Sequence, residues 1–334
     1  MRRRHPWSRL AMSLAGIVVA AALWLFVNNL VEPLWNLRLA YVAMYLTVLG
    51  GMVLLVGHSG QVSLGQGAFM AVGGYTFALA MMRGIALPLA FALVAIAGCV
   101  IGAVVGVVAA RMSGPYLAGL TLGLAVGLPA LANRFPDLLG GDSGLLLDGP
   151  YPPDSFGMEF PIERWQAWIA GAVAVVVVAV LMSLLASPAG RAFRAVRDHD
   201  AAASLSGVNV ARAKVAAFTV SAGCAALAGG VLTAILGLAA PGAFGIGLSL
   251  SLLVGVIVGG RNNLLGAGIG AVLLALLPEL LGGLVSRMSL SDQIGLNLAA
   301  LVYGCLLLLT VGLAPEGLSG LLRRSWQSRL PRSL

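Results

Sequence analysis

The chain has 334 residues, of which 60% are hydrophobic and only 10% are charged, and its mean hydropathy is +0.99. Soluble domains carry about 25% charged residues, so this chain has too few charges to cover a water-facing surface. The composition excludes a cytosolic enzyme, a secreted domain and a nucleic-acid-binding protein. The net charge of +8 therefore indicates basic cytoplasmic loops rather than a nucleic-acid partner.

Ten apolar segments approach the length of about 20 residues that a helix needs to cross a bilayer. In chain order they are residues 10–31, 37–56, 61–82, 86–110, 115–133, 165–186, 213–236, 246–260, 263–286 and 292–313. The first follows Arg2–Arg4, and its apolar run is longer than that of a signal peptide, so we expect a retained helix. The sequence predicts an all-α polytopic membrane protein with one transmembrane domain over residues 1–334.

The distribution of basic residues predicts the orientation. Ten spans require both termini on one side, and with both termini in the cytoplasm 15 of the 20 Lys and Arg residues are inside and five are outside, as the positive-inside rule demands. The two long connections are then an external loop at about 134–164, which carries six acidic residues, and a cytoplasmic loop at about 187–212.

Glycines recur at every fourth position in two of the spans. The two series are Gly98, Gly102 and Gly106, and Gly119, Gly123 and Gly127. This spacing places each series on one helix face, where two helix backbones can approach closely. We expect both faces to pack within the chain.

The sequence lacks the residues for catalysis. Lys214 is the only lysine and does not belong to a G-x-x-x-x-G-K-[ST] pattern, so this chain does not hydrolyse ATP through a P-loop. Ser143, within a GDSG segment, has no histidine on its side of the membrane to act as a base. An intramembrane protease would need a serine with histidine, or paired acids, inside the spans. We expect no catalytic residue, no cofactor and no metal.

The segment 57–69 is unusually polar for a membrane span. Ser59, Ser63, Gln66, Gly67 and Met70 follow a spacing that would place them on one helical face. Polar side chains at membrane depth either line a substrate pathway or bond to neighbouring helices in a packing seam. Both interpretations stay open, and the glycines would also permit a broken helix.

The loop that begins at Ser187 is predicted to form two short cytoplasmic helices. Ser187 and Pro188 are typical of a helix start, Asp200 is expected to cap the second helix, and Gly207 is expected to end it. The loop would lie on anionic lipid or dock a cytoplasmic partner. We favour docking, because a helix that only binds lipid needs no capped two-helix turn. The expected docking residues are Gly190, Arg191, Arg194, Arg197, Asp198, Ala202 and Gly207.

Glu279 is the only acidic residue well inside a span, and Pro278 precedes it. A carboxylate is costly in lipid, and a proline frees a backbone carbonyl. The residue would therefore bond at the interface or to a neighbouring helix, or else line a substrate path.

Three segments together resemble a known family. They are Gly57 to Tyr75, Gly190 to Gly207 with the following Lys214 to Gly229, and Ala314 to Leu321. In this order they are similar to the permease subunits of branched-chain amino-acid ABC importers, in the LivM-like rather than the LivH-like branch. The resemblance covers about residues 38–322, and Gln66 stands where the family usually has histidine.

The resemblance implies a permease subunit of an importer in the bacterial cytoplasmic (inner) membrane. It implies four kinds of partner: a second, LivH-like permease, two ATP-binding cassette subunits, a periplasmic or lipid-anchored solute-binding protein, and membrane lipid, with no nucleic acid. ATP binding by the partners would move the loop 187–209 and switch the access of the substrate cavity. Seven residues are expected on the substrate pathway: Ser59, Gln61, Ser63, Gln66, Gly67, Tyr75 and Glu279.

Two other functions fit the same sequence. A permease for urea or short amides would have a similar sequence. A stand-alone carrier driven by a proton gradient would need Glu279 as its titrating group.

Overall fold

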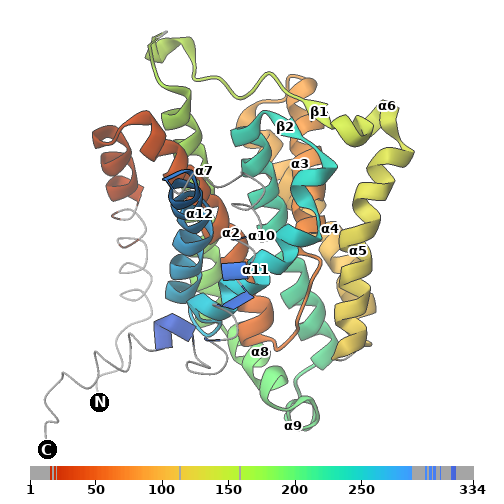
Figure 1. Cartoon of the computed structure of the whole chain (residues 1–334). Helices are drawn as coiled ribbons and strands as arrows, with labels where there is room; N and C mark the ends of the chain where they lie inside the picture. Colours follow the sequence, from red (N-terminus) through yellow and green to blue (C-terminus); the bar gives the residue numbers. More distant parts are fainter. Residues whose placement is uncertain are drawn as a thin grey trace, which may run out of the picture.

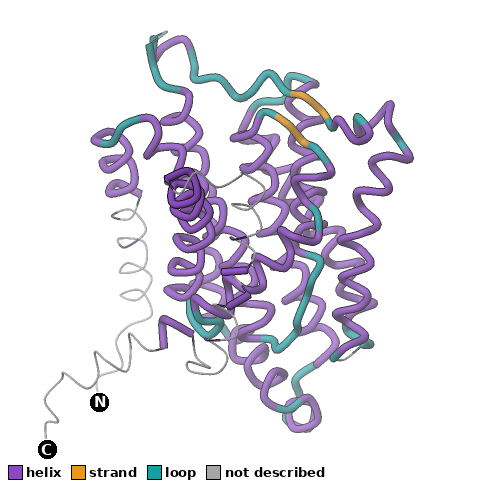
Figure 2. The backbone as a smooth tube through the Cα atoms, in the orientation of Figure 1, coloured by secondary structure: helices purple, strands orange, loops and turns teal. Residues whose placement is uncertain are grey.

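The computed structural model describes residues 16, 19, 21–112, 114–157, 159–287, 298, 301–302, 304–305, 309 and 317–320. Figures 1 and 2 show a bundle of helices with one small pair of strands. The elements in chain order are a helix Ala21–Leu30, α2 Pro33–Met52, a π-helix Val53–His58, α3 Gln66–Met82, α4 Leu87–Ala109, α5 Pro115–Arg134, α6 Pro136–Leu139, β1 Leu145–Leu146, α7 Ile162–Ala186, α8 Pro188–Asp198, α9 Asp200–Leu205, α10 Val210–Leu236, β2 Leu238–Ala239, α11 Ile246–Gly259 and α12 Leu264–Arg287.

Seven helical segments in the described residues are long and apolar enough to cross a membrane. They are Pro33–His58, Leu87–Ala109, Tyr116–Arg134, Ile162–Ala186, Val210–Leu236, Pro241–Gly259 and Leu264–Leu281. The predicted span 61–82 is instead the 17-residue helix α3, and the predicted span 292–313 lies largely outside the described residues. A multi-pass, predominantly helical protein is therefore confirmed, whereas the count of ten and the side of the termini stay predictions.

Helix α10 lies at the centre of the bundle and contacts α2, α3 and α4. The first glycine series explains the contact with α4: a Cβ added to Gly102 would lie 2.4 Å from the Cβ of Ala222. Helices α3 and α10 approach more closely still, because a Cβ on Gly229 would lie 1.8 Å from the carbonyl oxygen of Met70. The predicted close packing within the chain is confirmed for this series.

The second glycine series does not pack as expected. Gly119, Gly123 and Gly127 are exposed on α5, and within the described part of the chain no atom lies within 4 Å of a Cβ added to any of them. Helix α5 stands at the edge of the bundle (Figure 1) and turns its other face, with Thr121 and Ala125, inward. The prediction that this series packs within the chain is wrong for the described residues.

The loop 134–164 is tied to the end of α10 by the only sheet in the described residues. Strands β1 and β2 pair antiparallel, with Leu145 opposite Ala239 (Figure 2). Gly144 allows this approach, because it has a φ of +71° and a Cβ there would lie 2.3 Å from the carbonyl oxygen of Ala239. The loop lies at the end of the bundle opposite α8 and α9 (Figure 1).

Candidate functional site

The helical path breaks between α2 and α3. The π-helix after α2 ends at His58, and the chain is not helical again until α3 begins at Gln66. Gly60 supports the break, because its φ of +72° belongs to the left-handed region that favours glycine. The expectation that Ser59 and Ser63 share a helical face with Gln66 is wrong, because both serines precede the helix.

Side chains from other helices satisfy the backbone of this break. The amide of Leu64 donates to Oγ1 of Thr121 at 3.0 Å, and the amide of Gly67 donates to Oγ of Ser249 at 3.0 Å. The Oγ of Ser63 accepts from the amide of Gly65. These bonds matter because backbone groups without a helical partner must be satisfied inside the protein at membrane depth. The break is therefore part of the folded structure and is held by α5 and α11.

Gln66 and Gly67 lie in the contacts between helices. The side-chain nitrogen Nε2 of Gln66 donates to Oγ of Ser221 on α10 at 3.2 Å, and Oε1 of Gln66 is buried with no partner among the described residues. A Cβ on Gly67 would lie 2.6 Å from the carbonyl oxygen of Phe244. Ser63 and Gln66 are fully buried and bond to neighbouring backbone or to another helix. These contacts are those of a packing seam, one of the two alternatives that the sequence left open.

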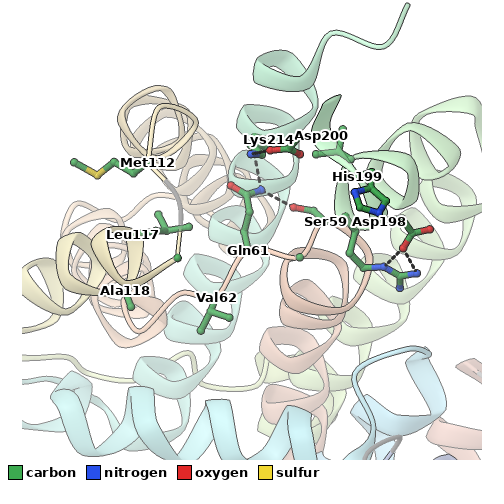
Figure 3. A pocket seen from close by; sticks show the side chains of 14 residues that line it. Ser59, Gln61, Val62, Met112, Leu117, Ala118, Asp198, His199, Asp200 and Lys214 are labelled. Carbon is green, nitrogen blue, oxygen red and sulfur yellow. Dashed lines mark hydrogen bonds and ion pairs between the residues drawn. The ribbon is translucent and has the colours of Figure 1, made fainter. Parts of the chain in front are cut away.

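Ser59 and Gln61 line a cavity of about 590 Å³ beside the break. Figure 3 shows its other walls, which come from the start of α5, from α8 and α9, and from Lys214 on α10. The side-chain nitrogen Nε2 of Gln61 donates to Oγ of Ser59 and to the carbonyl oxygen of Lys214. The Oε1 atom of Gln61 is buried without a partner in the described part of the chain. The cavity combines polar and charged groups with the apolar side chain of Leu117.

Tyr75 and Glu279 do not line this cavity. Tyr75 is buried in α3, nine positions after Gln66, and its hydroxyl has no partner among the described residues. The carboxylate of Glu279 accepts from Nε of Arg38 at 2.8 and 3.0 Å, and Arg38 Nη2 bonds to it as well. Glu279 thus bonds to α2, as one of the sequence alternatives expected, and both side chains are partly exposed.

The loop after α7 forms the two short helices that the sequence predicts. Ser187 begins α8, and its Oγ accepts from the amide of Ala189 at 3.1 Å. Gly207 ends the second helix with a φ of +82°, while Val208 donates to the carbonyl oxygen of Ala203. Both boundary predictions are confirmed.

The capping prediction for Asp200 is wrong. His199 occupies the N-cap position of α9 without a side-chain hydrogen bond, and Asp200 is the first residue of the helix. The carboxylate of Asp200 forms an ion pair with Lys214. The ion pair joins the start of α9 to α10, because Asp200 is the first residue of α9 and Lys214 belongs to α10. Both residues line the cavity (Figure 3).

Helix α8 is amphipathic, and its apolar side packs on the bundle. Gly190, Phe193 and Val196 are buried, whereas Arg191 and Arg197 are exposed and Arg194 is half-buried. Gly190 has a packing reason of its own, because a Cβ there would lie 2.3 Å from the carbonyl oxygen of Leu185.

Arg197 connects this helix to the break. Its Nη1 donates to the carbonyl oxygen of Gly57 at 2.8 Å, and its Nη2 forms an ion pair with Asp198 at 2.8 Å. Charge-assisted hydrogen bonds are stronger than neutral ones. This hydrogen bond joins α8 directly to the end of the π-helix.

The sequence did not point to several residues of the site. Thr121, Ser221 and Ser249 are single polar residues within apolar helices, and only the fold brings them to the break. Leu205 at the end of α9 is 91% exposed. Nothing in the sequence signals this exposure, because a single leucine beside alanines and serines has no periodic pattern.

Comparisons with known proteins identify the family of this chain. The family model described as "Branched-chain amino acid transport system / permease component" matches residues 34–311. The high-affinity branched-chain amino acid transport system permease protein LivM of Escherichia coli is 29% identical over 80% of this chain and 68% of the relative, and that of Salmonella typhimurium is 30% identical over the same shares.

A second kind of relative matches a shorter segment. The ribose import permease protein RbsC of Haemophilus influenzae is 34% identical over 137 residues, which are 40% of this chain and 41% of the relative. No solved structure matches the chain. In systems of this kind the permease is a non-catalytic membrane component, and separate subunits hydrolyse ATP. The match over residues 34–311, together with seven candidate membrane spans, shows that this chain belongs to the branched-chain amino acid transport system permease family and is a LivM-like ABC transporter permease.

Proposed function

We propose that this chain is the translocation subunit of an ABC importer for branched-chain or chemically related amino acids in the bacterial cytoplasmic membrane. The similarity to the LivM proteins supports the substrate class. The proposed partners are a second, LivH-like permease, two ATP-binding cassette subunits and a solute-binding protein. The distribution of basic residues supports a cytoplasmic position for α8 and α9.

The observation that carries the mechanism is the cavity between the helix break and α8 and α9, which we call the coupling helices. Helices α8 and α9 form one wall of it, and the break forms another. Arg197 and the Asp200–Lys214 ion pair join the coupling helices to the break and to α10. Closure of the ATPase subunits would push α8, move the break through Arg197 and open or close the cytoplasmic end of the substrate route beside Ser59 and Gln61.

The exposed residues of the coupling loop support the site of ATPase docking. Arg191, Ala202 and Leu205 are all exposed, so their side chains are available to a partner. Leu205 would enter an apolar groove of the ATPase, and Arg191 would meet acidic groups at the rim of that groove, because interface cores are apolar and their rims are polar.

The substrate class is tested by competition. Vesicles that contain the complete complex and its binding protein would take up labelled leucine, and excess valine or isoleucine would reduce that uptake because they share its binding groups. Excess urea or ribose would leave it unchanged. Inhibition by urea together with labelled urea uptake would replace the amino-acid assignment by a short-amide permease, and ribose uptake would point to the function that the name of the RbsC relative states.

A further inference from the structure

A second, apolar groove of about 680 Å³ lies between α4 and α7. Leu87 and Phe91 of α4 line one side of it, and Ala172 and Val176 of α7 line the other. Both helices contact α10, and Leu227 of α10 also lines the groove. Leu25 of the helix Ala21–Leu30 contributes to the lining as well, so the groove is a slot between α4 and α7 that this helix borders.

The apolar lining alone gives no preference for any one occupant. Lipid tails are as apolar as leucine, so an acyl chain gains little when it leaves bulk lipid for an apolar groove. Selective binding at this position must come from polar groups at the end of the groove.

Three hydrogen-bond donors in the first two turns of α7 have no acceptor among the described residues, and two of them belong to residues that line the groove. The Nε1 atoms of Trp165 and Trp168, which line the groove, and Nε of Arg164 are buried and have no hydrogen-bond partner in the described part of the chain. The indole of Trp24 is different, because its Nε1 donates to the carbonyl oxygen of Ala167 at 3.0 Å. A buried donor without an acceptor destabilises the protein, so three such donors together call for an external acceptor.

An aromatic cluster fixes the position of these donors. The ring of Phe160 lies 5.3 Å from that of Trp168, and the guanidinium carbon of Arg164 lies 5.7 Å from the centre of the Phe160 ring. Phe156 contacts both tryptophans. The donors are thus held in place before any ligand binds, which lowers the entropy cost of binding.

The charge of Arg164 and the position of the three donors along α7 indicate which chemical group accepts their hydrogen bonds. They lie in the first two turns of α7, at the end of the helix opposite α8 (Figure 1), the level at which interfacial tryptophans meet lipid headgroups. Arg164 forms no ion pair with its neighbour Glu163 or with any other described residue. A cationic guanidinium beside two indole N–H groups matches the oxygens of a phosphodiester and its glycerol esters.

We propose that this groove binds one phospholipid of the leaflet opposite the coupling helices. An acyl chain lies between α4 and α7, and the phosphate and ester oxygens accept from Arg164, Trp165 and Trp168. The bound lipid fills the space between two helices that α10 joins, and it satisfies donors that the protein leaves unpaired. The site is independent of the transported substrate.

The test is lipid titration of the purified permease complex, with bound lipid counted by native mass spectrometry. Phosphatidylglycerol and phosphatidylcholine should both bind, and diacylglycerol, which lacks the phosphate, should bind at least tenfold more weakly. Trp168→Phe, which removes only the N–H, and Arg164→Gln should each weaken phospholipid binding roughly tenfold, as the loss of one charge-assisted hydrogen bond implies. Ala172→Phe should abolish binding by filling the groove.

The matched control is Val104→Phe, an equally bulky change on the exposed surface of α4 outside the groove, and it should leave binding unchanged. ATPase activity of each variant complex shows that it is folded and assembled. Equal binding of diacylglycerol and phospholipid would overturn the headgroup assignment. Unchanged binding in Ala172→Phe, or a crosslink from Ala172→Cys to the second permease in the assembled complex, would overturn the site itself.

Discussion

Arg197 joins two segments that are 140 residues apart in the chain. Its guanidinium donates to the carbonyl oxygen of Gly57, and Gly60 leaves room for it, because a Cβ on Gly60 would lie 3.0 Å from Cγ of Arg197. The sequence predicts Arg197 as a coupling residue from its place in the loop. Its bond to the break could not be foreseen, because the partner is a backbone atom that the fold alone brings near.

Replacing Arg197 by leucine should separate ATP hydrolysis from transport. The change removes a charge-assisted hydrogen bond, which contributes about 1.5–3 kcal/mol, so the movement of α8 no longer reaches the break. We expect the reconstituted complex to keep most of its ATPase activity while substrate uptake falls roughly tenfold. The two rates are measured in the same vesicles.

Arg191→Leu is the comparison for docking, since Arg191 is an exposed arginine on the same helix and makes no hydrogen bond or ion pair with the break among the described residues. If Arg197→Leu left the ratio of substrate to ATP unchanged, the proposed transmission through Gly57 would be incorrect. An equal loss of uptake in both variants would assign the effect to docking of the ATPase instead.

At the scale of elements, local signals predicted what local interactions determine. The coupling helices follow from a serine cap, a proline at the first turn and a glycine at the last, all within the segment itself. The break at residues 59–65 was left open by the sequence, whose glycines permit a broken helix without deciding for it, and the structure confirms the break. Its sequence is compatible with a polar helical face, and the side chains that hold it open, from Thr121 and Ser249, lie far away in the chain.

The two glycine series have the same spacing in the sequence but different neighbours in the structure, so we predict that the same substitution has different effects in them. Gly102 lies against Ala222 of α10, whereas Gly123 faces open space in the described structure. Gly102→Leu should destabilise the chain by about 1–3 kcal/mol through overpacking, seen as a lower unfolding temperature in detergent. Gly123→Leu should leave that temperature nearly unchanged.

Gly123→Leu should instead weaken assembly with the second permease, because we expect the exposed face of α5 to contact it. Helix α5 stands at the edge of the bundle beside the cavity, whose lining includes Leu117 and Ala118 of that helix (Figures 1 and 3). Co-purification of the two permeases measures the effect. Full co-purification of Gly123→Leu would exclude this face as the contact.

At the scale of the whole molecule, composition and the order of three motifs were sufficient for the class of protein. Sparse charge predicts a membrane protein, and the family match over residues 34–311 agrees with the resemblance. The arrangement of helices around α10 was beyond the sequence, because in lipid close packing of small residues, rather than a hydrophobic pattern, decides which helices meet. The pairing of the loop 134–164 with β2 was missed because a two-residue strand leaves no periodic signal.

The structure also bears on how transport is energised. A carrier driven by a proton gradient needs a group that takes up and releases a proton on the substrate path, and Glu279 was the residue expected for that task. Its carboxylate instead bonds to Arg38 on α2, and it does not line the cavity beside the break. This arrangement favours transport driven by the partner ATPases.

The most direct measurement of the central claim is labelled leucine uptake by vesicles that contain this chain alone or the full complex. We predict uptake only with the full complex, its binding protein and hydrolysable ATP, and uptake that persists in Glu279→Gln when the proton gradient is collapsed. Uptake by the isolated chain, driven by a proton gradient and abolished in Glu279→Gln, would contradict the assignment as a permease of an ABC importer.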